Sequence, residues 1–377
     1  MVKDRKKGSR LFQAALFAAS VGLLVYFCVS GNNLAVLLGS LPTLNPFWLA
    51  CAAGSVALGW AMEACTLRGL VGRAVRPAYS FRRAFRTTMV GQYFNAVTPY
   101  ALAGQPMQLL SLMRQGVPSG IAVSALVRKF LVYQTSITGY SLLVIVVRYP
   151  FFRTKIQGFM ALAFIGFLCQ AAVVVLLLLF THSPGFTTRL IGGAVWALTK
   201  LRLVRRPEET RRKVRGQLQF YLENNRALKD DRALSARLYG FTLAQLTASF
   251  AVPFFIYKAF RSPGAPVFDM IAAQSFVTMI SSYTPLPGAA GAAEGSFLVI
   301  FRIFFNGEIL TQAMLLWRFL AYYSCIAVGA FFAGFDSRHA GEPQAAAEEA
   351  SAAAETAPAA AEGVSSAAAE GEGAKEK

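Results

Sequence analysis

Two short stretches combine helix-breaking residues with uncharged polar side chains inside apolar sequence. Residues 91–116 read GQYFNAVTPYALAGQPMQLLSLMRQG, and residues 274–295 read QSFVTMISSYTPLPGAAGAAEG. Glycine and proline interrupt helices, and non-helical backbone at membrane depth survives only against protein or a water-filled cavity. We therefore predict two re-entrant, cavity-lining hairpins over 87–116 and 270–305, with two ordinary kinked helices as the alternative. The expected structural breaks are Gly91, Pro99, Gly104, Pro106, Pro285, Pro287, Gly288 and Gly291.

The chemistry that these stretches offer is hydrogen bonding and charge pairing. The candidate substrate-binding residues are Gln92, Asn95, Thr98, Gln105, Gln108, Arg128, Thr284 and Glu294. Their amides and hydroxyls could bind a polar lipid headgroup, or they could satisfy the backbone of the hairpins themselves. Glu63 and Arg302 are weaker candidates.

Glu294 follows a Pro/Gly break, where a half-helix is expected to begin. A carboxylate there could complement the positive helix end. Alternatively it could face the cavity, pair with Arg128 or Arg318, or bind a proton. Arg128 and Lys129 lie within a long apolar segment, where charges usually face a cavity or a partner; snorkelling to the headgroups is the other interpretation.

Metal, cofactor and nucleotide chemistry find little support in the sequence. The chain has two His, and its five Cys fall singly in apolar segments without metal-binding spacing. No Walker-type phosphate loop is present. We therefore predict no metal site, no cofactor and no catalytic residue.

Composition indicates an all-α, polytopic integral membrane protein. Of its 377 residues 55% are hydrophobic and only 15% are charged. Apolar runs of spanning length predict about six full spans. They lie at approximately 11–29, 47–67, 118–147, 158–180, 238–260 and 310–335. With the first hairpin entering from the cytoplasm and the second from outside, the arrangement is that expected of an inverted repeat.

The distribution of charged residues predicts how the chain is oriented in the membrane and which parts of it lie outside the spans. The net charge is +18, with basic residues between the spans, which favours anionic lipid over nucleic acid as the partner. We expect a plasma-membrane protein with both termini cytoplasmic. The predicted parts are a basic N-terminus (1–10), a transmembrane domain (11–335) with a basic cytoplasmic insertion (182–237), and a disordered Ala/Glu-rich tail (336–377).

Two motifs carry a resemblance to a known family. They are Asn95…Thr98-Pro99…Ala103-Gly104-Gln105-Pro106 and Pro285-Leu286-Pro287-Gly288…Gly291…Glu294. On these motifs the chain resembles the lysylphosphatidylglycerol synthase transmembrane, flippase-like (UPF0104) family over roughly residues 10–335. Many relatives carry Gly-Gly-Glu-Pro where this chain has Ala103 to Pro106, so an acidic group is absent here.

The resemblance implies translocation of a phospholipid, anionic or aminoacylated, such as phosphatidylglycerol or its lysyl ester. In full-length synthases of this kind a soluble domain transfers Lys from aminoacyl-tRNA. We do not expect that domain in residues 336–377, and so do not expect the transfer activity. The alternatives are an integral-membrane transferase of phospholipid biosynthesis, a phosphatidylglycerol lysyltransferase by family name, and a non-catalytic membrane partner of a separate lipid synthase.

Overall fold

The computed structural model describes residues 41–75, 79–155, 159–182, 231–282 and 284–338, together with Gly39, and these are helical with no strand. The N-terminal elements are η2 (Leu41–Thr43), α3 (Pro46–Ala74), α4 (Phe81–Val97), η3 (Pro99–Ala101), α5 (Gly104–Arg114), α6 (Ser119–Lys155) and α7 (Phe159–His182). The C-terminal elements are α10 (Arg232–Ala259), α11 (Val267–Ser281), η4 (Pro287–Ala289), α12 (Ala292–Phe301), α13 (Gly307–Arg318), η5 (Phe319–Tyr323) and α14 (Ser324–Arg338).

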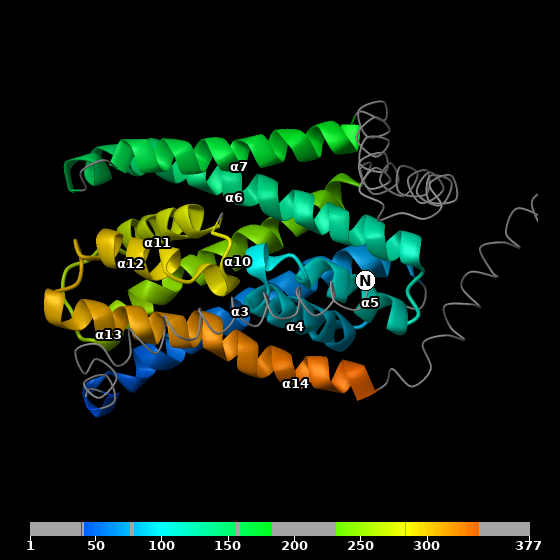
Figure 1. The fold of residues 1–377 in the computed structure, drawn as a ribbon, viewed down its shortest axis with the longest axis horizontal. Helices are drawn as coiled ribbons and strands as arrows, with labels where there is room; N and C mark the ends of the chain where they lie inside the picture. Colours follow the sequence, from blue (N-terminus) through cyan, green and yellow to red (C-terminus); the bar gives the residue numbers. More distant parts are fainter. Residues whose placement is uncertain are drawn as a thin grey trace, which may run out of the picture.

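Long helices lie roughly along the long axis of the molecule (Figure 1). Four of the described helical stretches are long and apolar enough to cross a membrane, namely Pro46–Ala74, Ser119–Arg148, Arg232–Ala259 and Ile309–Gly334. Shorter apolar helices occupy Phe164–Leu179, Val267–Ser281 and Pro287–Phe301. An all-α, polytopic membrane protein is therefore confirmed. The expected span at 11–29, the basic N-terminus and most of 182–237 and 336–377 lie outside the described residues.

The packing of α3 against α10 forms the centre of the bundle. Asn45 begins α3 by accepting a hydrogen bond from the Phe47 amide at 3.0 Å, with Pro46 in the first helical position, where its missing N–H costs nothing. The Ser55 hydroxyl donates to the Ala248 carbonyl oxygen at 2.7 Å. This contact ties the two helices together at a point where both are buried.

Two helical hairpins lie between these long helices: α4–η3–α5 and α11–η4–α12. Figure 1 shows them extending toward the middle of the molecule from opposite ends of its long axis. Their tips, η3 and η4, are in contact with each other. An inverted repeat would produce two opposed hairpins of this kind. That the two hairpins enter a membrane from its opposite faces stays a prediction.

The chain changes direction in both hairpins where the sequence places Pro and Gly. In the first tip Tyr100 has φ 53° and Ala101 has φ 54°, a conformation that is uncommon for residues with a side chain. In the second tip Gly288 and Gly291 have φ 59° and 83°, where glycine carries no steric penalty. Pro287 begins η4 and is buried.

The predicted break at Gly91 is not observed, because α4 continues through it. The glycine instead permits close packing: a Cβ at Gly91 would collide with the Gln108 side chain of α5. Gly104 has the same role opposite Asn95. Pro106 lies in the first turn of α5, where an N–H is not required. Small residues therefore let α4 and α5 approach each other while polar side chains fill the space between them.

Candidate functional site

A cavity of about 510 Å³ lies among α3, α4, α5, α6, α7 and α10. It reaches the tip of the first hairpin at Tyr100, which is 57% exposed, and the end of α11 at Ser282. The polar side chains that line it are Glu63, Thr66, Gln92, Asn95, Tyr100, Gln105, Gln108, Lys129, Tyr133, Gln134, Gln170, Thr242, Gln245 and Ser282. A lining this rich in amides is unusual between apolar helices, and its volume falls in the range of about 300–1,000 Å³ typical of ligand pockets.

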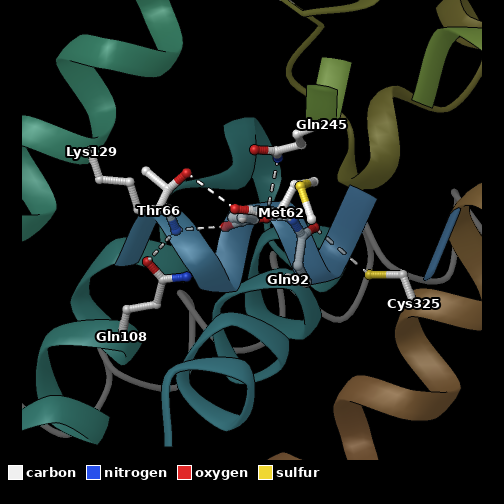
Figure 2. Close-up of polar contacts among 8 residues, drawn as sticks. Met62, Thr66, Gln92, Gln108, Lys129, Gln245 and Cys325 are labelled. Carbon is white, nitrogen blue, oxygen red and sulfur yellow. Dashed lines mark hydrogen bonds and ion pairs between the residues drawn. The ribbon is translucent and has the colours of Figure 1, made fainter. Parts of the chain in front are cut away.

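A buried ion pair stands at the centre of this lining. Lys129 Nζ lies 2.5 Å from Glu63 Oε1, and the two side chains are 14% and 9% exposed. Lys129 Nζ also donates to Gln108 Oε1 at 3.2 Å. Figure 2 shows Gln108 beside Lys129. Charges at membrane depth are costly unless paired, so each of these two groups needs the other.

Amide side chains hold the second oxygen of the carboxylate. Gln92 Nε2 donates to Glu63 Oε2 at 2.5 Å, and Gln245 Nε2 donates to the same oxygen at 3.4 Å. The Cys325 thiol of α14 lies 3.9 Å from Gln92 Oε1, so the last helix also reaches this network (Figure 2). The carboxylate is thus positioned from α4, α6 and α10, while it is itself carried by α3.

Two acceptors of the lining have no hydrogen-bond partner among the described residues. They are Gln170 Oε1 on α7 and Asn95 Oδ1 on α4. Gln170 is only 1% exposed. A buried polar atom without a partner costs free energy. Both oxygens are buried from solvent, and Asn95 Oδ1 lies against Gly104 of α5, so they belong to the packing between the helices.

Four of the eight predicted binding residues line the cavity: Gln92, Asn95, Gln105 and Gln108. The other four do not line it. The Thr98 hydroxyl donates to the Phe94 carbonyl oxygen at 2.6 Å and accepts from the Ala103 amide at 3.3 Å, so it serves the hairpin's own backbone.

Arg128 and Thr284 lie outside the cavity lining. Arg128 Nη2 donates to Ser235 Oγ on α10 at 3.0 Å. Thr284 follows α11, and its amide donates to the Ser281 carbonyl oxygen at 3.1 Å. Arg302, the weaker candidate, is exposed at the end of α12.

Glu294 forms a second buried ion pair, in the other half of the chain. Its Oε1 accepts from Arg318 Nε at 2.6 Å, and both side chains are 6% exposed. Its Oε2 accepts from the Gly291 amide at 2.7 Å, at the start of α12. Arg318 Nη2 also donates to the Gly288 carbonyl oxygen at 2.9 Å. The Glu294 carboxylate therefore accepts a hydrogen bond at the start of α12 and also pairs with Arg318, so two of the alternatives raised from the sequence apply to it together.

The second ion pair is linked to the tip of the first hairpin through Tyr322. The Arg318 guanidinium lies 5.1 Å from the centroid of the Tyr322 ring. The Tyr322 hydroxyl donates to the Ala96 carbonyl oxygen of α4 at 2.9 Å. Tyr322 belongs to η5, a π-helical turn, and such turns are frequent at functional sites. This arrangement holds the two hairpin tips together.

Sequence reasoning did not single out Lys129, Gln170 or Gln245 as binding residues. A signal for Lys129 does exist: α6 contributes Leu126, Lys129, Phe130, Tyr133, Gln134 and Ile137 to the lining, which is one helical face. Gln170 and Gln245 are isolated amides in apolar helices, and such residues usually mark a polar interior. Within the described chain, no group of three or more His, Cys, Asp or Glu could hold a metal ion.

Comparison with known proteins shows the family of the chain. Residues 12–329 match the family described as "Lysylphosphatidylglycerol synthase TM region". The chain belongs to this family. It is also similar to a "UPF0104 membrane protein" of Archaeoglobus fulgidus, 24% identical over 326 residues that cover 85% of this chain and 93% of that protein. Membership of the lysylphosphatidylglycerol synthase transmembrane family indicates a membrane protein of phospholipid metabolism.

Proposed function

We propose that this protein moves a phospholipid between the two leaflets of the cell membrane, with both termini in the cytoplasm. The observation that carries the proposal is the amide-lined cavity with its buried Glu63–Lys129 pair, placed between hydrophobic helices. The barrier to lipid exchange is the transfer of a polar headgroup through hydrocarbon. A polar cavity at this depth lowers that barrier.

The outer surface supports the same mechanism. Large apolar side chains are exposed on the helices around the cavity, among them Val146 on α6 and Phe164 and Ile165 on α7. The acyl chains can then stay in the bilayer against this surface while the headgroup passes through the polar interior. The family description points to phosphatidylglycerol or its lysyl ester as the first substrates to test. Movement would be passive or ion-coupled.

A transferase acting on phospholipid headgroups is the second candidate, because the family description names a synthase. Such an enzyme needs a convergent catalytic set. Glu63 and Lys129 are the charged side chains in the described lining, and they neutralise each other. A third possibility is a membrane partner of a separate lipid synthase, which needs no catalytic set at all.

Translocation can be measured with the purified protein in separate liposome preparations that contain trace fluorescent phosphatidylglycerol, its lysyl ester or phosphatidylethanolamine. An impermeant quencher reports the outer leaflet, so a protein that moves lipid makes more than half of the fluorescence accessible. We expect wild type to do so for at least one of these lipids, and Glu63→Gln and Lys129→Gln to be slower by about tenfold or more, since each leaves a buried charge unpaired.

Arg83→Gln is the control. Arg83 is an exposed base at the start of α4, the helix that carries Gln92, and it does not line the cavity. This variant should retain the wild-type rate. Equal slowing of all variants would indicate loss of folding rather than of transport. If wild type matches empty liposomes for every headgroup, translocation by this chain alone is refuted. Release of a lysylated lipid would favour the transferase, and co-purification with a soluble synthase would favour the partner.

A further inference from the structure

We infer that the Glu63–Lys129 pair marks a subsite for a zwitterionic phosphoethanolamine headgroup, with the Lys129 ammonium occupying the ammonium position while the cavity is empty. The inference rests on the proposed function and names the substrate class of the same cavity. It is carried by the charge balance of the lining and by the acceptors that Lys129 shares.

The charges of the described lining balance, with one carboxylate and one ammonium group. A headgroup with one phosphodiester and one ammonium can pair with both: its ammonium with Glu63 and its phosphate with Lys129. Phosphatidylglycerol carries no cation, so Glu63 would lose its partner whenever Lys129 turned to the phosphate. The lysyl ester carries an additional ammonium, for which the described lining has no second acid. Unpaired buried charges are strongly unfavourable.

The hydrogen-bonding groups of the cavity separate ethanolamine from choline. The acceptors that Lys129 now holds, Glu63 Oε1 and Gln108 Oε1, need a donor when Lys129 turns away. A primary ammonium supplies several N–H donors to a carboxylate and nearby carbonyl oxygens. A trimethylammonium group has the same charge but no donor. The lining therefore fits the primary amine of a zwitterionic headgroup.

Lys129 is suited to exchange because its ammonium is a compact charge on a flexible stem. It is already shared between Glu63 Oε1 at 2.5 Å and Gln108 Oε1 at 3.2 Å. The opposite carboxylate oxygen is held separately by Gln92 and Gln245. Glu63 can thus stay in place while an incoming ammonium replaces Lys129, which then swings toward the phosphodiester. Before the exchange and after it, each charge in the described lining has a partner of opposite sign.

Binding can be tested on the purified protein in detergent with short-chain phospholipids that share acyl chains and differ in headgroup. We expect the ethanolamine lipid to bind about tenfold or more tightly than the choline or glycerol lipid, because it alone combines balanced charge with N–H donors. In wild type, stepwise N-methylation of the ethanolamine should weaken binding progressively. This series needs no variant, so it stays decisive even where a substitution impairs folding. Equal affinity across the series would overturn the inference.

Glu63→Gln should abolish the preference for ethanolamine over glycerol, and Arg83→Gln, at an exposed base outside the lining, should keep it. Glycerophosphoethanolamine, the soluble headgroup without acyl chains, should bind far more weakly than the lipid. Equal binding would assign the site to a free phosphodiester and overturn the lipid assignment. Selective binding without translocation in liposomes would support this inference and refute the proposed function. Translocation without headgroup preference would support the function and refute this inference.

Discussion

The ion pair between Glu294 and Arg318 allows a quantitative test of one predicted binding residue. It asks whether Glu294 stabilises the fold and is not needed for lipid binding. Arg318→Met would leave the Glu294 carboxylate buried without its cation. Glu294→Leu would leave the Arg318 guanidinium buried with only the Gly288 carbonyl oxygen and neighbouring aromatic rings as contacts. The double variant removes both charges and puts similar apolar volume in their place. The structure predicts that the double variant is more stable than either single one.

The magnitude follows from the burial of the pair, since each side chain is 6% exposed. Removing one member of a buried pair costs about 3–5 kcal/mol, whereas replacing both by apolar residues is often close to neutral. We therefore expect each single variant to lose about 3–5 kcal/mol of unfolding free energy and the double variant to lose less than either. The coupling energy of the pair is the sum of the two single losses minus the loss in the double variant.

Unfolding in mixed micelles, followed by circular dichroism while the denaturing detergent is titrated, measures these free energies. Arg302→Gln is the control: Arg302 is exposed at the end of the same helix, and its loss should change the unfolding free energy by about 0.5 kcal/mol or less. The reasoning is refuted if either single variant is as stable as wild type, or if the double variant loses the sum of the single losses. A stable double variant that still translocates lipid would exclude Glu294 from headgroup binding.

Three further experiments test the hairpins. Gly104→Ala should destabilise the protein by about 1–3 kcal/mol and slow translocation, because the new methyl group collides with Asn95; thermal unfolding and the liposome assay measure the two effects. Tyr322→Phe removes the hydrogen bond from η5 to the end of α4 and should cost about 0.5–1.5 kcal/mol in the same unfolding assay. In a background without native cysteines, cysteine at Gly116 should react with an impermeant maleimide only from the cytoplasmic side, and cysteine at Ser262 only from outside. Labelling of both from one side would exclude opposed entry of the hairpins.

The sequence was sufficient to predict the fold class and the places where the helices end. Pro99 and the Pro287-Gly288 step do lie at the hairpin tips, because proline and glycine act locally on the backbone. Gly91 was misinterpreted for a tertiary reason. Its missing Cβ makes room for Gln108, a residue of another helix, and no local rule distinguishes such a packing glycine from a breaking one.

The site was only partly predictable for a similar reason. Arg128 and Lys129 are adjacent in sequence, yet neighbouring residues on a helix point about 100° apart. Lys129 therefore faces the cavity, whereas Arg128 contacts Ser235 of α10. Which of the two directions is the interior depends on how α6 packs against α3 and α10. Glu63 was only a weak candidate from the sequence, because the residues that bind its carboxylate come from three other helices, α4, α6 and α10.

The balanced charge of the cavity lining has an electrical consequence. In the described lining Glu63 and Lys129 sum to zero, so an empty cavity and one that holds a zwitterion carry the same net charge. A singly charged headgroup crossing the membrane would gain or lose about 2.3 kcal/mol per 100 mV of membrane potential. A zwitterion gains and loses nothing. If the headgroup is a zwitterion and its movement is passive, the protein would exchange lipid at the same rate in an energised and in a depolarised cell.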